Sequence, residues 1–196
     1  MHRLISGILP GRTIFRRKGG ILAIFEYKGI KPEIGKDCYI AESAEVIGNV
    51  SLGRGVYVGP GAKIRGDYGS IQIGDGTAVE QNCVIHARPG EICRINCRVT
   101  LGHMCIIHNA KLIDNYAVIG MGSIVSDWAV VGEWSVVAEG GVVKNKQEVP
   151  PGKIAAGAPV KIIRNVSDEY KKNWTRFKQV YVDLAGSYAA DLKKIG

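Results

Sequence analysis

Three histidines, His86, His103 and His108, are the residues best suited to chemistry in a chain that has only four histidines. A single histidine in a β-rich sequence is more often a structural residue than a ligand. Three in one stretch favour a shared role, because neutral imidazoles are good ligands for zinc, iron and cobalt. Three such ligands with an open fourth position make a catalytic rather than a structural metal site. The histidines therefore predict a metal centre that holds a Zn ion, or alternatively an Fe or Co ion.

The spacing of two of these histidines predicts that the metal is shared between subunits. His103 and His108 are five residues apart, and an extended chain of that length spans about 16 Å. Two ligands of one ion must come much closer, since each nitrogen lies about 2 Å from the metal. Neighbouring copies of the chain solve this problem, and threefold packing gives three equivalent sites. We therefore expect a homotrimer with one metal ion at each subunit interface.

A six-residue repeat predicts the scaffold that positions the histidines. Aliphatic residues recur every six positions in three runs, from Ile34 to Ile64, from Ile73 to Ile85 and from Leu101 to Val143. This period fits neither an amphipathic helix nor a simple alternating strand, but it fits a short strand followed by a corner. Three such units close a triangular coil, and successive coils pair their backbones. The seventeen units counted in the sequence correspond to between five and six coils.

The repeat also sets the expected boundaries. We predict an all-β solenoid, a left-handed parallel β-helix of hexapeptide repeats, over residues 26–163. A basic extension, residues 1–25, precedes it, and a C-terminal α-helix occupies residues 164–196. Ser167 is the expected N-cap of that helix. Apolar residues three or four positions apart then predict a stripe packed against a face of the solenoid; they are Trp174, Phe177, Tyr181, Leu184 and Tyr188.

Composition argues against several classes of partner. The formal net charge is +8, but no basic run is interleaved with stacking aromatic residues, so we expect no nucleic acid partner. No apolar run approaches the roughly 18 residues of a membrane span, so we expect no membrane partner. Five cysteines, an odd number, in a chain without a secretory signal favour reduced thiols in the cytoplasm. An organellar presequence within residues 1–25 stays open.

The histidines belong to a longer ordered set of motifs. Arg65-Gly-Asp67 is followed by Cys-Val-Ile-His86-Ala and then by Gly-His103-Met-Cys-Ile-Ile-His108. This order resembles the gamma-class carbonic anhydrases and the related phenylacetate- and carnitine-pathway proteins, over about residues 24–190. The resemblance implies that His86 and His108 come from one subunit and His103 from its neighbour. It also implies that Arg65 and Asp67 organise the interface and the water network beside the metal.

The activity implied by the resemblance is the hydration of carbon dioxide, a small-molecule substrate, to bicarbonate. A bound metal ion makes this possible by lowering the pKa of water toward neutrality. The chain departs from the family at one place, where Asn-x-Gln-Asp is replaced by Ala-Val-Glu80-Gln81. The charge of Glu80 would alter the pKa of nearby water, and Gln81 cannot form the ion pair with Arg65 that an aspartate offers. We therefore count Glu80 and Gln81 with Arg65 and Asp67 as candidate catalytic residues and expect slow hydration.

Other functions stay open at this point. The same fold is the scaffold of many acyl-CoA transferases, and the segment from Gly157 to Lys161 resembles theirs as well. Such a transferase needs one general-base histidine rather than three ligands, so metal content separates the two classes. Thioesterase activity and a non-catalytic role as an assembly subunit are the remaining alternatives.

Overall fold

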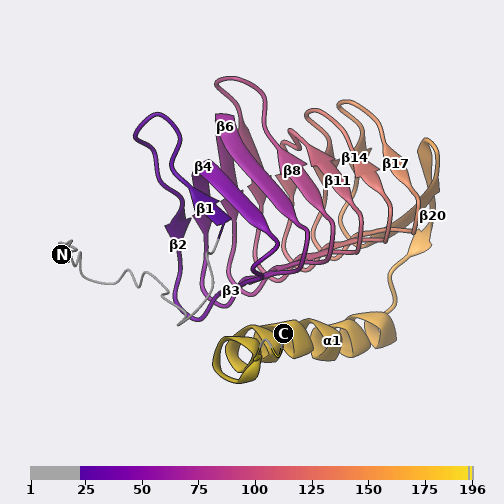
Figure 1. Cartoon of the computed structure of the whole chain (residues 1–196). Coiled ribbons are helices and arrows are strands. Elements are labelled where there is room, and N and C mark those ends of the chain that lie inside the picture. Colours follow the sequence, from indigo (N-terminus) through magenta and orange to yellow (C-terminus); the bar gives the residue numbers. More distant parts are fainter. Residues whose placement is uncertain (1–22, 194, 196) are drawn as a thin grey trace, which may run out of the picture.

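The computed structural model describes residues 23–193 and residue 195, and in it the chain winds into a left-handed parallel β-helix followed by one α-helix (Figure 1). Each coil contributes one short strand to each of three faces, because the six-residue repeat places a corner after every strand.

The helix face is an eight-stranded sheet in which seven successive parallel strands are followed by one antiparallel strand. Its strands are β3 (Tyr39–Ile40), β5 (Tyr57–Val58), β7 (Ala78–Val79), β10 (Thr100–Leu101), β13 (Val118–Ile119), β16 (Val136–Val137), β19 (Lys153–Gly157) and the antiparallel β20 (Val160–Asn165).

The other two faces belong to a single twelve-stranded sheet, because two long strands, β4 (Glu45–Leu52) and β6 (Lys63–Ile73), pass from one face to the other. The histidine face also contains β1 (Ala23–Phe25), β8 (Val84–His86), β11 (Ile106–His108), β14 (Ile124–Val125) and β17 (Val142–Val143). The third face also contains β2 (Glu33–Ile34), β9 (Ile92–Ile95), β12 (Leu112–Ile113), β15 (Val130–Val131) and β18 (Glu148–Val149).

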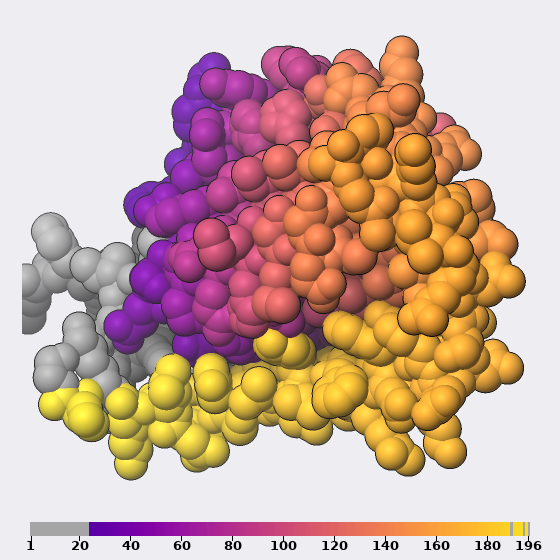
Figure 2. All heavy atoms as spheres, turned by 90° about the vertical axis from the view of Figure 1, so that its right-hand side faces the viewer, coloured from indigo at the N-terminus to yellow at the C-terminus, as the bar shows by residue number. Residues whose placement is uncertain are grey.

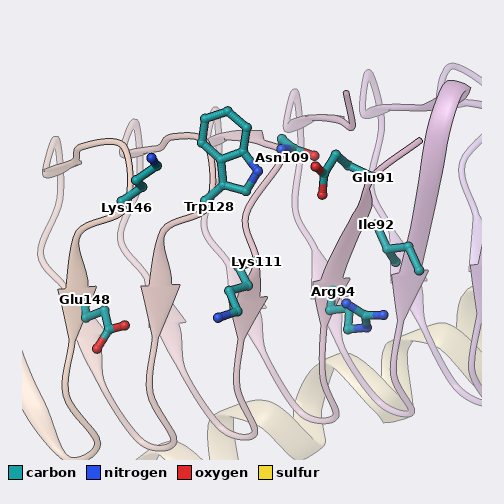
Figure 3. Close-up of a pocket in the computed structure, with 8 residues that line it drawn as sticks. All are labelled: Glu91, Ile92, Arg94, Asn109, Lys111, Trp128, Lys146 and Glu148. Atoms are coloured by element: carbon teal, nitrogen blue, oxygen red, sulfur yellow. The ribbon is translucent and has the colours of Figure 1, made fainter. Parts of the chain in front are cut away.

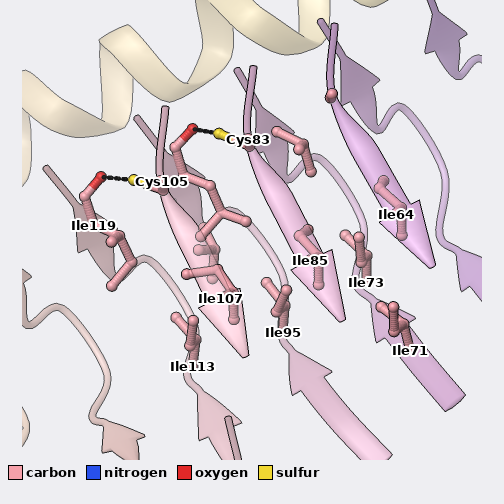
Figure 4. Packing of buried hydrophobic residues seen from close by; sticks show 14 of the residues in the cluster. Ile64, Ile71, Ile73, Cys83, Ile85, Ile95, Cys105, Ile107, Ile113 and Ile119 are labelled. Atoms are coloured by element: carbon pink, nitrogen blue, oxygen red, sulfur yellow. Dashed lines mark hydrogen bonds between the residues drawn. The ribbon is translucent and has the colours of Figure 1, made fainter. Parts of the chain in front are cut away.

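The repeat residues form columns inside the prism. Ile85 pairs in register with Ile64 on one side and Ile107 on the other, and all three are fully buried (Figure 4). Cys83 and Cys105 fill the neighbouring corner, where each thiol donates a 3.1 Å hydrogen bond to a glycine carbonyl oxygen. All five cysteines are free thiols.

The fold class predicted from the sequence is confirmed, but the predicted number of coils is too small. Seven parallel strands on the helix face indicate about seven coils, because the residues that interrupt the repeat form strands as well. Ile71 of β6 and Ile95 of β9 are buried like the regular repeat residues. The expected boundaries shift slightly: Ala23–Phe25 already pairs with β4, and β20 extends to Asn165. Residues 1–22 of the predicted basic extension lie outside the described residues.

The helix α1 (Asp168–Asp191) begins as predicted, with the Ser167 side chain accepting a hydrogen bond from the Tyr170 backbone N–H. It lies along the helix face, from β16 and β13 at its N-terminal end to β3 at its C-terminal end (Figures 1 and 2). The predicted stripe is wrong at one position, because Phe177 is 60% exposed and Lys178 is 2% exposed in its place. None of the helices in the described part of the chain is long and apolar enough to cross a membrane.

Candidate metal centre

The predicted ligands lie at two opposite edges of the histidine face. His103 is in the corner before β11, and His108 is the last residue of β11, so the width of one face separates them. His108 pairs in register with His86 on the adjacent coil. We name the edge with His86 and His108 the double-histidine edge, and the edge with His103 and Glu80 the single-histidine edge.

At the double-histidine edge the parallel register stacks three predicted site residues. Arg65 of β6 pairs with His86, and His86 pairs with His108. The centroids of the two imidazoles are 5.6 Å apart. The structure therefore places Arg65, His86 and His108 of one chain side by side.

Asp67 links two of these residues through its carboxylate. One oxygen lies 3.0 Å from Nε2 of His86, and the other accepts a 2.7 Å hydrogen bond from Arg65. Burial by itself would raise the pKa of Asp67, but the hydrogen bonds from Arg65 and His86 outweigh it and the pKa is lowered. Asp67 therefore stays ionised beside His86, and the exposed ring of Tyr68 contacts the same imidazole edge to face.

Asp127 and Arg88 complete this edge, although the sequence analysis did not single them out. The Asp127 carboxylate lies 2.8 Å from Nδ1 of His108 and accepts two hydrogen bonds from the Arg88 guanidinium. These bonds from Arg88 lower the pKa of Asp127, and His108 contributes to the same effect. The sequence offered one clue to Asp127, namely its place in the six-residue repeat. Asp127 lies in the corner one coil after the corner that follows His108.

The single-histidine edge has a different construction. Nε2 of His103 is 3.1 Å from the Glu80 carboxylate, which also accepts a 3.2 Å hydrogen bond from the His103 backbone N–H. Glu80 is only 6% exposed and lies beside Tyr181 of α1, where its carboxylate adds to the effect of burial in raising the pKa of Tyr181. Glu80 therefore connects His103 to the C-terminal helix.

Gln81 lies beneath α1, away from Arg65 of the same chain. Its amide nitrogen donates a 3.4 Å hydrogen bond to the Tyr57 hydroxyl, beneath α1. Its amide oxygen is buried without a partner. Gln81 thus belongs to the single-histidine edge and is not placed beside Arg65 within the subunit.

Within one subunit the described residues hold no group of three or more histidine, cysteine, aspartate or glutamate side chains arranged to bind a metal ion. The surface between the two edges is apolar, because Val84 and Ile106 project outward from neighbouring strands and are 38% and 43% exposed. Met104 and Met121, at the single-histidine edge, are exposed too. The histidine face thus carries donor atoms on both borders and an apolar surface in the middle.

A cavity of about 490 Å³ lies on the third face, and none of the predicted site residues lines it (Figure 3). It is lined by Glu91, Ile92, Arg94, Asn109, Lys111, Trp128, Lys146 and Glu148. Its side chains of opposite charge come from neighbouring corners and strands, and no histidine is among them.

Comparisons with known proteins agree with this fold. Residues 31–66 match the family described as bacterial transferase hexapeptide (six repeats). A hexapeptide transferase family protein from Anaplasma phagocytophilum has a similar structure, with a TM-score of 0.81 and 33% identity over 85% of this chain and 98% of that one. The fold and the repeat therefore define a hexapeptide-repeat protein.

Sequence relatives narrow this class. Mitochondrial gamma carbonic anhydrase 2 of Arabidopsis thaliana is 33% identical over 83% of this chain. The match covers only 60% of the length of that relative. The carnitine operon protein CaiE of Citrobacter koseri is 34% identical over 87% of this chain and 86% of its own length. The chain belongs to the hexapeptide-repeat family that contains the gamma carbonic anhydrases and CaiE.

Proposed function

We propose that the protein is a homotrimeric enzyme that hydrates carbon dioxide at a three-histidine metal centre, with one Zn, Fe or Co ion at each subunit interface. The observation that carries the proposal is the placement of His103 and His108 at opposite edges of one face. In a ring of three subunits, the single-histidine edge of one copy meets the double-histidine edge of the next. His103 then joins His86 and His108 of its neighbour.

The donor set fits a divalent metal of this kind. Three imidazoles are the ligands, and Nε2 of His108 is left available because the Asp127 contact uses Nδ1. Carboxylates lie beside all three imidazoles, at distances of 2.8 to 3.1 Å. A metal ion held there would supply the Lewis acidity that makes water nucleophilic at neutral pH.

The other residues of the centre have supporting roles in this proposal. Asp67, fixed by Arg65, orients His86, and Glu80 orients His103. Tyr68 covers the His86 ring. Gln81 supports its own edge from beneath α1 rather than pairing with Arg65.

The apolar surface of the histidine face supports self-association. Val84, Ile106, Met104 and Met121 expose apolar area between the donor atoms of the two edges. Burying this surface against a second copy is favourable, and the same contact brings the two edges together. A cytoplasmic location, consistent with the five free thiols, is also part of this proposal.

A mixing experiment tests the shared centre. After random mixing of His103→Ala and His108→Ala subunits, each trimer that contains both should regain metal at one of its three interfaces, because each subunit supplies what the other lacks. Over all trimers, mixed and unmixed, this is about a quarter of the interfaces. Metal content of the separated trimers, measured by elemental analysis, gives the result.

The matched control mixes His86→Ala with His108→Ala. Both histidines come from the same subunit at any interface, so this mixture should regain no metal. Recovery in both mixtures, or in neither although mixed trimers have formed, would contradict the shared centre.

A second candidate function is acyl transfer, which the His103–Glu80 pair favours. A carboxylate 3.1 Å from an imidazole nitrogen can orient that imidazole as a general base, and the family includes transferases by name. This candidate, like a thioesterase, requires no stoichiometric metal for His103 to act as a base. Wild-type protein that has no bound metal but has acyl-CoA-dependent activity would favour acyl transfer. Absence of both carbon dioxide hydration and acyl-CoA-dependent activity would favour an assembly subunit.

A further inference from the structure

We infer that Asp127, held in place by Arg88, presets His108 as the anchoring ligand of the metal centre. This inference rests on the proposed function. It assigns a positioning role to two residues at the double-histidine edge and orders the three histidines by how well their own subunit prepares them.

The three residues come from consecutive coils of the solenoid. Arg88 follows β8, His108 ends β11 and Asp127 follows β14, and these strands are neighbours in the sheet. Asp127 is 5% exposed, so its carboxylate is shielded from water. A shielded carboxylate needs partners for both oxygens, and here protein side chains supply them.

The contacts define one orientation of the carboxylate. Arg88 Nε donates to Oδ1 over 2.8 Å and Arg88 Nη2 donates to Oδ2 over 2.7 Å. Such a forked pair fixes position as well as charge. The Trp128 ring lies 5.8 Å from the same guanidinium, which favours this placement of Arg88.

The fixed carboxylate determines which imidazole nitrogen carries the proton. Oδ1 of Asp127 lies 2.8 Å from Nδ1 of His108, and an ionised carboxylate can only accept a hydrogen bond. His108 therefore carries its proton on Nδ1 and presents the lone pair of Nε2 to a metal.

The other two imidazoles are held through the opposite ring nitrogen. Both His86 and His103 direct Nε2 at a carboxylate in the isolated subunit. His108 is therefore the one member of the proposed ligand set whose Nε2 is left unused by the contacts of the described residues. It should be the first histidine to engage the metal.

The test uses full-length, metal-free protein and the isosteric change Asp127→Asn. Nitrogen-detected NMR should show His108 with its proton on Nδ1 in the wild type and as a mixture of both tautomers in the variant. Titration with Co²⁺ should show an affinity about 10-fold to 100-fold lower in the variant. Arg88→Lys, which keeps the charge but loses the fork, should show a smaller loss.

The matched control is Asp75→Asn. Asp75 also accepts two hydrogen bonds from an arginine, Arg54, but has no imidazole beside it, so its loss should leave Co²⁺ affinity unchanged. Equal Co²⁺ affinity and unchanged His108 tautomer in Asp127→Asn would overturn this inference while leaving the three-histidine centre in place. Wild-type trimer that binds no Co²⁺ would instead overturn the proposed function, and the ligand role of His108 with it.

Discussion

The two edges of the histidine face use the same coil geometry in different ways. At the double-histidine edge, each imidazole contacts an aspartate that is paired with an arginine, Arg65 or Arg88, on the same surface. At the single-histidine edge, His103 contacts Glu80, which has no arginine partner among the described residues and lies beside Tyr181 of α1 instead. The first edge is organised by the solenoid alone, whereas the second depends on the C-terminal helix.

In the proposed trimer, the difference teaches which half of the shared centre is prepared before subunits meet. The imidazoles of His86 and His108 are held by neighbouring coils, whose register is fixed by the buried columns of the prism. The side chain of His103 is 43% exposed and stands beside the exposed Met104. Its final surroundings should therefore come from the neighbouring subunit.

Ile106→Glu should have the largest effect on the two edges, because it places a charge on the surface between them. Burying an unpaired carboxylate at a subunit contact costs several kcal/mol, so the trimer should dissociate and all bound metal should be lost. Light scattering and elemental analysis measure the two effects. Ile163→Glu, at a position 61% exposed on β20, is the control and should leave both unchanged. A trimeric Ile106→Glu variant with full metal content would show that the histidine face does not form the subunit contact.

Glu80→Gln should have a smaller effect, limited to the single-histidine edge. A carboxylate beside the reaction site disfavours further negative charge there, so its removal should let hydration proceed at lower pH. One pKa unit corresponds to a tenfold change in the active fraction, and we expect a gain of about threefold to tenfold at neutral pH. The pH profile of carbon dioxide hydration is the measurement, with the exposed Glu91→Gln as control. Slower turnover at every pH, with metal retained, would show that Glu80 accepts the proton instead.

Lys178→Met should leave the metal centre unchanged and affect stability, since Lys178 lies behind the single-histidine edge. Its ammonium group bonds Thr100 and the Ala117 carbonyl oxygen, over 2.9 and 3.1 Å, between α1 and the helix face. Burial lowers the pKa of Lys178 from 10.5 to about 7, although Glu80 opposes the shift and Arg98 adds to it. Below pH 7 the folded protein must hold the buried charge of Lys178. Above about pH 10.5 Lys178 is uncharged in both the folded and the unfolded protein.

The stabilisation by Lys178→Met should therefore be greatest at and below pH 7 and should shrink as the pH rises toward 10.5. We expect a difference on the order of 5 kcal/mol between these limits, since the pKa of Lys178 falls from 10.5 to about 7 and one pKa unit corresponds to about 1.4 kcal/mol. Urea unfolding at pH 6.5 and pH 10 measures it, with the exposed Lys172→Met as control. An equal effect at both pH values would show that Lys178 stays charged in the folded protein.

The fold was accessible from the sequence because every coil repeats the same requirement for a buried aliphatic residue. Ile85 and Ile107 could be assigned to the core from spacing alone. The spacing also indicated that His103 and His108 cannot meet within one subunit. These inferences depend on local periodicity, which a single sequence shows directly.

The partners of the histidines were not accessible in the same way. Asp127 contacts Arg88 across 39 positions of sequence, and no local pattern distinguishes that pair from ordinary charged corner residues. The burial of Lys178 in place of Phe177 also escaped prediction, because helical spacing alone assigns the stripe to the larger apolar residue. Only the tertiary packing of α1 on the helix face decides between these neighbours.

The antiparallel strand β20 has a consequence for solubility. A parallel ladder that stopped at β19 would leave a row of unpaired backbone groups at the end of the coils, which invites copies to stack end to end into filaments. β20 folds back over that row with an irregular register and carries the charged residues Lys161 and Arg164 on the new border. The border strands of the other two faces at this end, β17 and β18, are only two residues long. The C-terminal end of the prism is thus protected against fibrous aggregation, and association is directed to its sides.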